Sequence, residues 1–258
     1  MRKLEVYYLA NKNENIYLAL LGDCSAGPNK EEKFDEEVIK EGLKQIEILN
    51  SMYPSKEENM PKFNFIYRKR FWNGKEECYL GWERKRGLLN QFNEYLLGNE
   101  ENVFRENSLE KWKKQNNIKE LPKVKYIITL DSDTELVLST GLELIGAMEH
   151  ILNKPELNGK KDCVIEGHAL MQPRVGINLN ASRKYLFKNI FAGSGGVDPY
   201  ANAISDIYQD NFDEGIFTGK GIYDLEVFSK VLKNEIPENK VLSHDLLEGS
   251  YLRCRPCK

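Results

Sequence analysis

The pattern of apolar and polar positions divides the chain into segments with the periods of strands and of helices. Short apolar runs at Ile16–Leu21, Phe63–Tyr67 and Tyr126–Leu130 are rich in β-branched and aromatic residues and predict buried strands. Glu31–Met52 and Glu83–Leu97 repeat apolar residues at the helical period, with charged residues on the other face. Because strands alternate with helices, the pattern predicts a three-layer α/β/α sandwich on a mostly parallel sheet.

The rest of the chain continues this alternation and includes one polar stretch. Asn73-Gly74 predicts a hairpin turn. Further elements are expected as a strand at Cys163–Met171 and helices at Ser139–Leu152, Ala181–Phe191, Asp224–Leu232 and Ser243–Arg253. The stretch around 98–123 is polar and predicts a mobile insertion. Residues 1–258 are expected to form a single domain.

Composition narrows the possible partners. Charged residues make up 30% of the chain but the net charge is only −3, so charge does not indicate a nucleic-acid partner. No apolar run approaches the roughly 20 residues that span a bilayer, and the first residues lack a signal-peptide core, so a soluble, non-secreted chain is expected. Five cysteines, an odd number, favour reduced thiols. Cys254 and Cys257 have the spacing of a zinc or redox pair, but incidental cysteines at a frayed end are favoured.

Paired carboxylates stand directly after one predicted strand. Asp131 and Asp133 follow Tyr126–Leu130 with one residue between them. Two carboxylates this close repel each other unless a cation lies between them, and Mg²⁺ or Mn²⁺ bridging to phosphates is a suitable one. Nucleotide-sugar glycosyltransferases use an Asp-x-Asp pattern of this kind. An Asp-rich turn before the next helix is the alternative interpretation.

Candidates in the first half of the chain are an acid and a group of cations. Asp23, after the Ile16–Leu21 strand, could accept from the N3–H of a uracil ring, or could simply open a turn. Lys85 lies among basic residues at a predicted helix start, where helix end and cations both favour a diphosphate. Taken alone, that basic cluster is favoured as a solvated turn.

Candidates in the second half are more varied. Gln172 and Arg174 are polar positions at a strand-like run and suggest the lining of a cleft, whereas His168 is favoured as a structural histidine over a metal ligand. Lys220 stands between two glycines, which allow close approach of the backbone to a ligand. Asp245 offers a general base at a helix start, or a helix cap.

Together these patches resemble the glycosyltransferase domain of the cyclic β-1,2-glucan synthases. The resemblance covers nearly the whole chain apart from the polar stretch around 98–123. The matching stretches are Leu9–Asn11, Gly81–Gly87, Tyr126–Thr134, Gln172–Val175, Asp198–Tyr200, Ser205–Asp206, Tyr208–Asp210, Thr218–Asp224, Pro237–Asn239 and Leu242–Gly249.

The resemblance implies a nucleotide-diphospho-sugar transferase (GT-A-like) fold and an enzyme that uses UDP-glucose to extend a β-1,2-glucan with inversion. Asp23 would contact the uracil, Lys85 and Lys220 the nucleotide, and Asp131 with Asp133 a metal, Mg²⁺ or Mn²⁺. Two further roles are implied: Gln172 and Arg174 would bind the growing glucan acceptor, and Asp245 would be the catalytic base.

The chain departs from this family in two ways. An acidic residue usual near Ala26 is absent, and the family has a further strand–helix unit before Leu4. Family members also carry flanking membrane helices and carbohydrate-active domains. The expectation is a partial domain from a protein of the bacterial inner membrane that faces the cytoplasm.

Two other functions compete with this one. The first is an inactive fragment that binds nucleotide sugar or glucan. The second is a phosphatase of the haloacid-dehalogenase type, whose strand also ends in Asp-x-Asp. Glu135 stands where that class has Thr or Val, which counts against the phosphatase.

Overall fold

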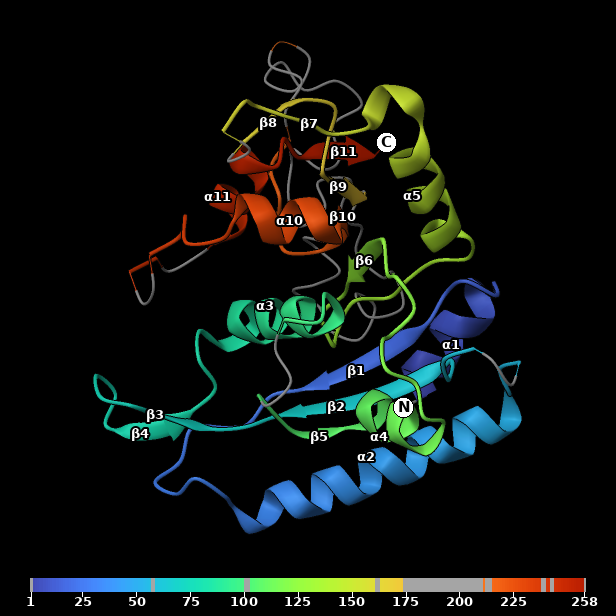
Figure 1. Cartoon of the computed structure of the whole chain (residues 1–258), viewed down its shortest axis with the longest axis vertical. Coiled ribbons are helices and arrows are strands. Elements are labelled where there is room, and N and C mark those ends of the chain that lie inside the picture. The colour runs from blue at the N-terminus through green and yellow to red at the C-terminus, as the bar shows by residue number, and fades with distance from the viewer. Residues whose placement is uncertain are drawn as a thin grey trace, which may run out of the picture. The chain divides into compact units, whose positions relative to one another are not determined.

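The computed structural model describes residues 2–56, 59–99, 103–160, 163–173, 211, 215–237, 240–241 and 244–257. The fold is mixed α/β with small sheets (Figure 1). The chain divides into two compact units, and each is described by itself. The first comprises residues 1–124 and 135–139, and the second comprises 125–134 and 140–258.

The sheet of the first unit has three strands in the order β1-β2-β5. Strand β1 (Leu18–Gly22) pairs parallel with β2 (Phe63–Arg68), and β5 (Phe104–Asn107) pairs antiparallel on the other side of β2. All six residues of the central strand β2 are buried. The expected burial of β1 is only partial, because β1 has a pairing partner in this sheet on one side alone, and Leu20 is exposed.

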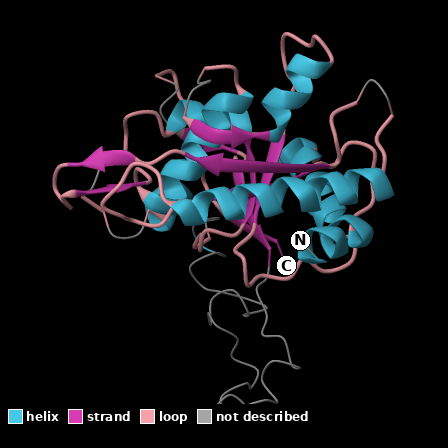
Figure 2. Cartoon of the chain, turned by 90° about the horizontal axis from the view of Figure 1, so that it is seen from below, coloured by secondary structure: helices cyan, strands magenta, loops and turns pink. Residues whose placement is uncertain are grey.

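Helices cover both faces of this sheet. Alternate residues of β2 point to opposite faces. Phe63 and Phe65 pack with Ile46 of α2 (Lys33–Met52), whereas Ile66 packs with Leu88 of α3 (Arg84–Leu96). Helix α2 lies along the sheet in both views (Figure 2). The remaining elements are α1 (Arg2–Ala10), α4 (Ser108–Gln115) and the hairpin β3 (Phe71–Asn73) with β4 (Cys78–Leu80).

The polar stretch around 98–123, expected to be a mobile insertion, contains two elements that the pattern did not predict, β5 and α4. Phe104 and Leu109 are buried in the core of the unit, and the Asn107 side chain caps α4 by accepting from two backbone N–H groups. Few apolar residues suffice here because Phe104 and Leu109 are placed where the strand and the helix face the core. Residues 100–102 lie outside the described part.

The sheet of the second unit has four strands in the order β11-β9-β10-β6. Strand β10 (Gly221–Asp224) runs antiparallel to both β6 (Tyr126–Thr129) and β9 (Leu170–Pro173), and β11 (Arg255–Cys257) runs parallel to β9. The sheets are therefore mixed, and the expected mostly parallel sheet is not what the described residues form. An apolar run carries no information on strand direction, which is why the pattern could not predict this.

Two further differences concern where the strands of this unit begin and end. The expected strand Cys163–Met171 is split into β8 (Val164–Glu166), which pairs with β7 (Glu156–Leu157), and β9. Gly167 separates them with φ +66°, and a Cβ there would lie 1.9 Å from the Lys154 carbonyl oxygen, so only glycine fits. The C-terminal end is not frayed, because β11 pairs with β9 and Cys254 is fully buried.

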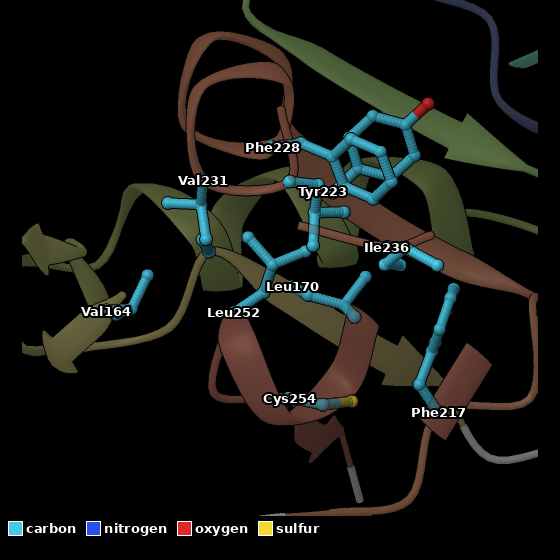
Figure 3. Close-up of a cluster of buried hydrophobic side chains, with 11 residues drawn as sticks. Val164, Leu170, Phe217, Tyr223, Phe228, Val231, Ile236, Leu252 and Cys254 are labelled. Carbon is cyan, nitrogen blue, oxygen red and sulfur yellow. The ribbon is translucent and has the colours of Figure 1, made fainter. Parts of the chain in front are cut away.

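The described helices of the second unit are α5 (Thr140–Glu149), the 3-10 turn η1 (Ile151–Asn153), α10 (Leu225–Val231) and α11 (Asp245–Tyr251). The core lies between sheet and helices (Figure 3), where the rings of Tyr223 and Phe228 stack at 4.1 Å near Leu170 and Leu252. The helix expected at 181–191 lies outside the described residues. Among the described helices, none has both the length and the apolar character needed to cross a membrane.

Candidate functional site

In the first unit, Asp23 is held by a buried arginine. Asp23 follows β1, and its carboxylate accepts from Arg68 Nε at 3.0 Å and from a second Arg68 nitrogen at 3.3 Å. It also accepts from the backbone N–H of Cys24 at 2.9 Å. The Arg68 side chain is fully buried, whereas that of Asp23 is 32% exposed. The carboxylate is thus fixed in orientation and still accessible to a ligand.

The same arginine reaches the start of α3. Arg68 donates to the Trp82 carbonyl oxygen at 2.8 Å. A Cβ at Gly81 would lie 1.9 Å from an Arg68 nitrogen, and a Cβ at Gly87 would lie 1.8 Å from the Trp82 oxygen. Both glycines of this motif are therefore needed for close packing. Lys85 is exposed in the first turn of α3.

A second buried network holds the turn that carries Asp23. Asp35 accepts from two Arg70 nitrogens, from Tyr67 Oη at 2.7 Å and from Arg105 at 3.1 Å. Burial alone would raise the pKa of the Asp35 carboxyl, but hydrogen bonds from Arg70, Tyr67 and a backbone N–H lower it to about 2. Arg70 Nε donates to the Ser25 carbonyl oxygen at 2.7 Å. The turn after β1 is therefore fixed by ion pairs.

In the second unit, the acidic pair follows β6 as predicted. Asp131 Oδ2 lies 2.9 Å from Lys220 Nζ, and the two side chains are 31% and 25% exposed. The Asp131 carbonyl oxygen accepts from the backbone N–H of Thr134 at 3.1 Å, so the segment is a turn, and Asp133 is exposed. The segment is therefore a turn that exposes the Asp133 side chain, and its role as a metal-binding carboxylate pair stays a prediction.

The loop from Thr218 to Lys220 brings three more candidates together. Gln172, almost completely buried, accepts from the Thr218 N–H at 2.6 Å and from the Thr218 hydroxyl at 3.1 Å. Gly219 has φ +77°, and a Cβ there would lie 3.1 Å from both carboxylate oxygens of Asp245. Asp245 is the first residue of α11, with no capping hydrogen bond from the side chain of the preceding residue. One short loop thus adjoins Gln172, Asp245 and, through Lys220, Asp131.

The two carboxylates suit a hard divalent cation whose remaining ligands are water and substrate phosphates. Asp131 and Asp133 supply oxygens one residue apart, and Mg²⁺ is commonly bound by one or two carboxylates with water and substrate phosphates. The described residues contain no group of three acidic, histidine or cysteine side chains for a metal. His168 is structural, since its Nδ1 lies 2.8 Å from the Arg253 carbonyl oxygen. Asp131 and Asp133 are therefore the two described carboxylates that could hold such a cation together with substrate phosphates.

Some expectations are revised and others stay open. Gln172, expected to bind the glucan acceptor, has a buried side chain that accepts from the Thr218 loop, and its acceptor role stays a prediction. Arg174 lies outside the described residues. The sequence pattern did not identify Arg68 and Arg70 as site residues. Two arginines spaced two residues apart at the end of an apolar strand are nevertheless a signal for buried ion pairs.

The fold and these contacts define a mixed α/β protein with a carboxylate pair after a sheet strand, faced by a lysine-bearing loop. No protein-family model matches the chain. The chain is 40% identical over 255 residues to the cyclic beta-(1,2)-glucan synthase NdvB of Rhizobium meliloti (strain 1021). That alignment covers 98% of this chain but 9% of the relative, so the chain corresponds to a short segment of a much longer protein.

Proposed function

We propose that the chain is the glucosyltransferase segment of a cyclic β-1,2-glucan synthase and uses UDP-glucose to extend a β-1,2-glucan. The observation that carries the proposal is the loop Thr218–Lys220, which lies against Asp245 and pairs with Asp131. A candidate base and a candidate diphosphate site thus adjoin one loop. The similarity to the glucan synthase over 98% of the chain supports the choice of reaction.

The donor roles follow from charge and accessibility. Within the first unit, Asp23, oriented by Arg68, would accept from the N3–H of a uracil ring, and Lys85, exposed at the α3 start, would pair with phosphate oxygens. Asp131 and Asp133 would hold Mg²⁺ or Mn²⁺, which when bound neutralises charge on the leaving diphosphate. Lys220 would contribute a second positive charge to that diphosphate.

The transfer step requires a base. Asp245 would accept the proton of an acceptor hydroxyl while the hydroxyl oxygen bonds to the anomeric carbon and the bond from that carbon to UDP breaks. Attack opposite the leaving group inverts the anomeric centre. In the longer protein, this segment would face the cytoplasm beside membrane helices and take the growing glucan as acceptor, with Arg174 on the acceptor side.

The test separates binding from transfer. Asp131→Ala should abolish metal-dependent binding of UDP measured by calorimetry, because it removes a metal ligand. Asp245→Asn in the full-length synthase should keep UDP binding and lose transfer of radiolabelled glucose. Glu235→Gln, an exposed position of the same unit, is the matched control and should change neither. Glucan synthesis that survives both substitutions would refute the assigned roles.

The same variants test the competing functions. An inactive binding fragment predicts UDP-glucose binding without turnover even in the full-length protein. A phosphatase predicts a beryllofluoride adduct on Asp131 in wild type, which the transferase function does not allow.

A further inference from the structure

Lys220 and Asp131 form an ion pair at the place where the proposed function needs a metal. Lys220 Nζ lies 2.9 Å from Asp131 Oδ2. We infer that Lys220 is an exchangeable internal cation: it pairs with Asp131 before the donor arrives and transfers to the donor diphosphate when metal and nucleotide bind together. This inference rests on the proposed function. It concerns the order in which the Lys220 ammonium and the metal ion occupy the site beside Asp131.

The charges explain why the exchange is needed. A divalent ion on the Asp131 carboxylate would be close to the Lys220 ammonium, and two cations at that separation repel each other. Lys220 therefore competes with the metal for Asp131 as long as no diphosphate is bound. A diphosphate adds further negative oxygens, which a lysine ammonium binds as a point charge. With a nucleotide present, Lys220 and the metal no longer compete, and both stabilise the same anion.

The loop is built so that the side chain can move while the backbone stays fixed. Before Lys220, Thr218 is anchored by two hydrogen bonds to the buried Gln172. After it, Gly221 opens β10, where a Cβ would lie 2.3 Å from the Met171 carbonyl oxygen. Both ends of the loop are therefore fixed against β9. The Lys220 side chain is 25% exposed and has a flexible four-carbon stem, so it can change partner without moving the backbone.

The exchange predicts that loss of the Lys220 charge has opposite effects on metal affinity and on nucleotide affinity. A purely structural ion pair would not give these opposite effects. Removal of the Lys220 charge should favour metal binding when nucleotide is absent, because the competing cation is gone. The same removal should weaken nucleotide binding when metal is saturating, because the diphosphate loses one cation.

The experiment titrates Mn²⁺ alone, and then UDP at saturating Mn²⁺, into wild type and Lys220→Gln by calorimetry. Lys220→Gln should bind Mn²⁺ alone about two- to fivefold more tightly, the range of an exposed ion pair. It should bind UDP about tenfold more weakly, as expected for a lost charge-assisted contact. Lys220→Arg should resemble wild type in both titrations, and Lys233→Gln, an exposed lysine of the same unit, should change neither.

Each result has one meaning. If Asp131→Asn weakens Mn²⁺ binding but Lys220→Gln leaves it unchanged or weaker, the exchange is wrong while the metal site of the proposed function stands. If Asp131→Asn leaves Mn²⁺ binding unchanged, or wild type binds no Mn²⁺ even in the presence of UDP, the carboxylate pair holds no metal and both proposals fail.

Discussion

Asp35→Asn should destabilise the first unit. It should also remove the part of the pH dependence of unfolding that comes from the Asp35 carboxyl. The Asp35 carboxylate is fully buried and accepts from Arg70, Tyr67, Arg105 and the Glu32 backbone N–H. An asparagine of the same size offers one acceptor oxygen in place of two and carries no charge. Removal of one partner from a buried ion pair costs about 3–5 kcal/mol. Because Asn keeps the shape and one acceptor, a loss of about 3 kcal/mol at pH 7 is expected.

The pH dependence has a definite sign. The pKa of Asp35 falls from its ordinary value of 3.8 to about 2 in the folded chain. A depressed carboxyl pKa adds stability that is fully present above the unfolded pKa and is lost as pH falls through the folded pKa. At about 1.36 kcal/mol per pKa unit, the difference between the unfolded and folded pKa values of Asp35 corresponds to about 2 kcal/mol of stability. The difference between wild type and Asp35→Asn should therefore narrow by about 2 kcal/mol as the pH falls from about 5 to about 2.

The assay is urea unfolding followed by tryptophan fluorescence. All three tryptophans, Trp72, Trp82 and Trp112, belong to the first unit, so the signal reports that unit. Glu36→Gln is the matched control, since Glu36 also pairs with Arg105 but is 75% exposed, and it should cost less than about 1 kcal/mol. A difference between wild type and Asp35→Asn that stays constant with pH would refute the reasoning, as would a loss below about 1 kcal/mol at pH 7.

Three further substitutions test other contacts. Gly87→Ala places a Cβ 1.8 Å from the Trp82 carbonyl oxygen and should lower the free energy of unfolding by about 3 kcal/mol in the same fluorescence assay. Arg68→Gln releases the Asp23 carboxylate and should weaken UDP binding about tenfold by calorimetry, with unchanged binding as the contrary result. Gly219→Ala strains a residue at φ +77° beside Asp245, so in the full-length synthase it should reduce glucose transfer at least about tenfold while UDP binding persists.

Local patterns predicted the elements whose apolar residues are regularly spaced. The helical period of Glu31–Met52 corresponds to α2, and the β-branched run at Tyr126 corresponds to β6 with Asp131 directly after it. These predictions succeeded because the apolar period of a helix or strand depends only on residues close together in the sequence. The strand and helix within the polar stretch around 98–123 were not predicted, because low apolar content hid the spacing of Phe104 and Leu109.

Strand direction and long-range ion pairs could not be predicted this way. The antiparallel course of β10 depends on a chain path that no local pattern records. Arg68 and Asp23 are 45 residues apart, and their pairing follows from the register of β1 on β2. A charged side chain in an otherwise apolar strand signals that a partner must exist, because an unpaired buried charge is too costly. It does not say which residue the partner is.

The loop Thr218–Lys220 shows why the candidate site depends on contacts between distant segments. Its sequence suggested only close backbone approach to a ligand, from the glycines around Lys220. In the structure, Gly219 instead makes room for the Asp245 carboxylate, and Thr218 satisfies the buried Gln172. Because one rigid loop carries these contacts and also the Lys220–Asp131 pair, a disturbance of any one of them should shift the others. Substitutions at these positions should therefore have non-additive effects on the free energy of unfolding.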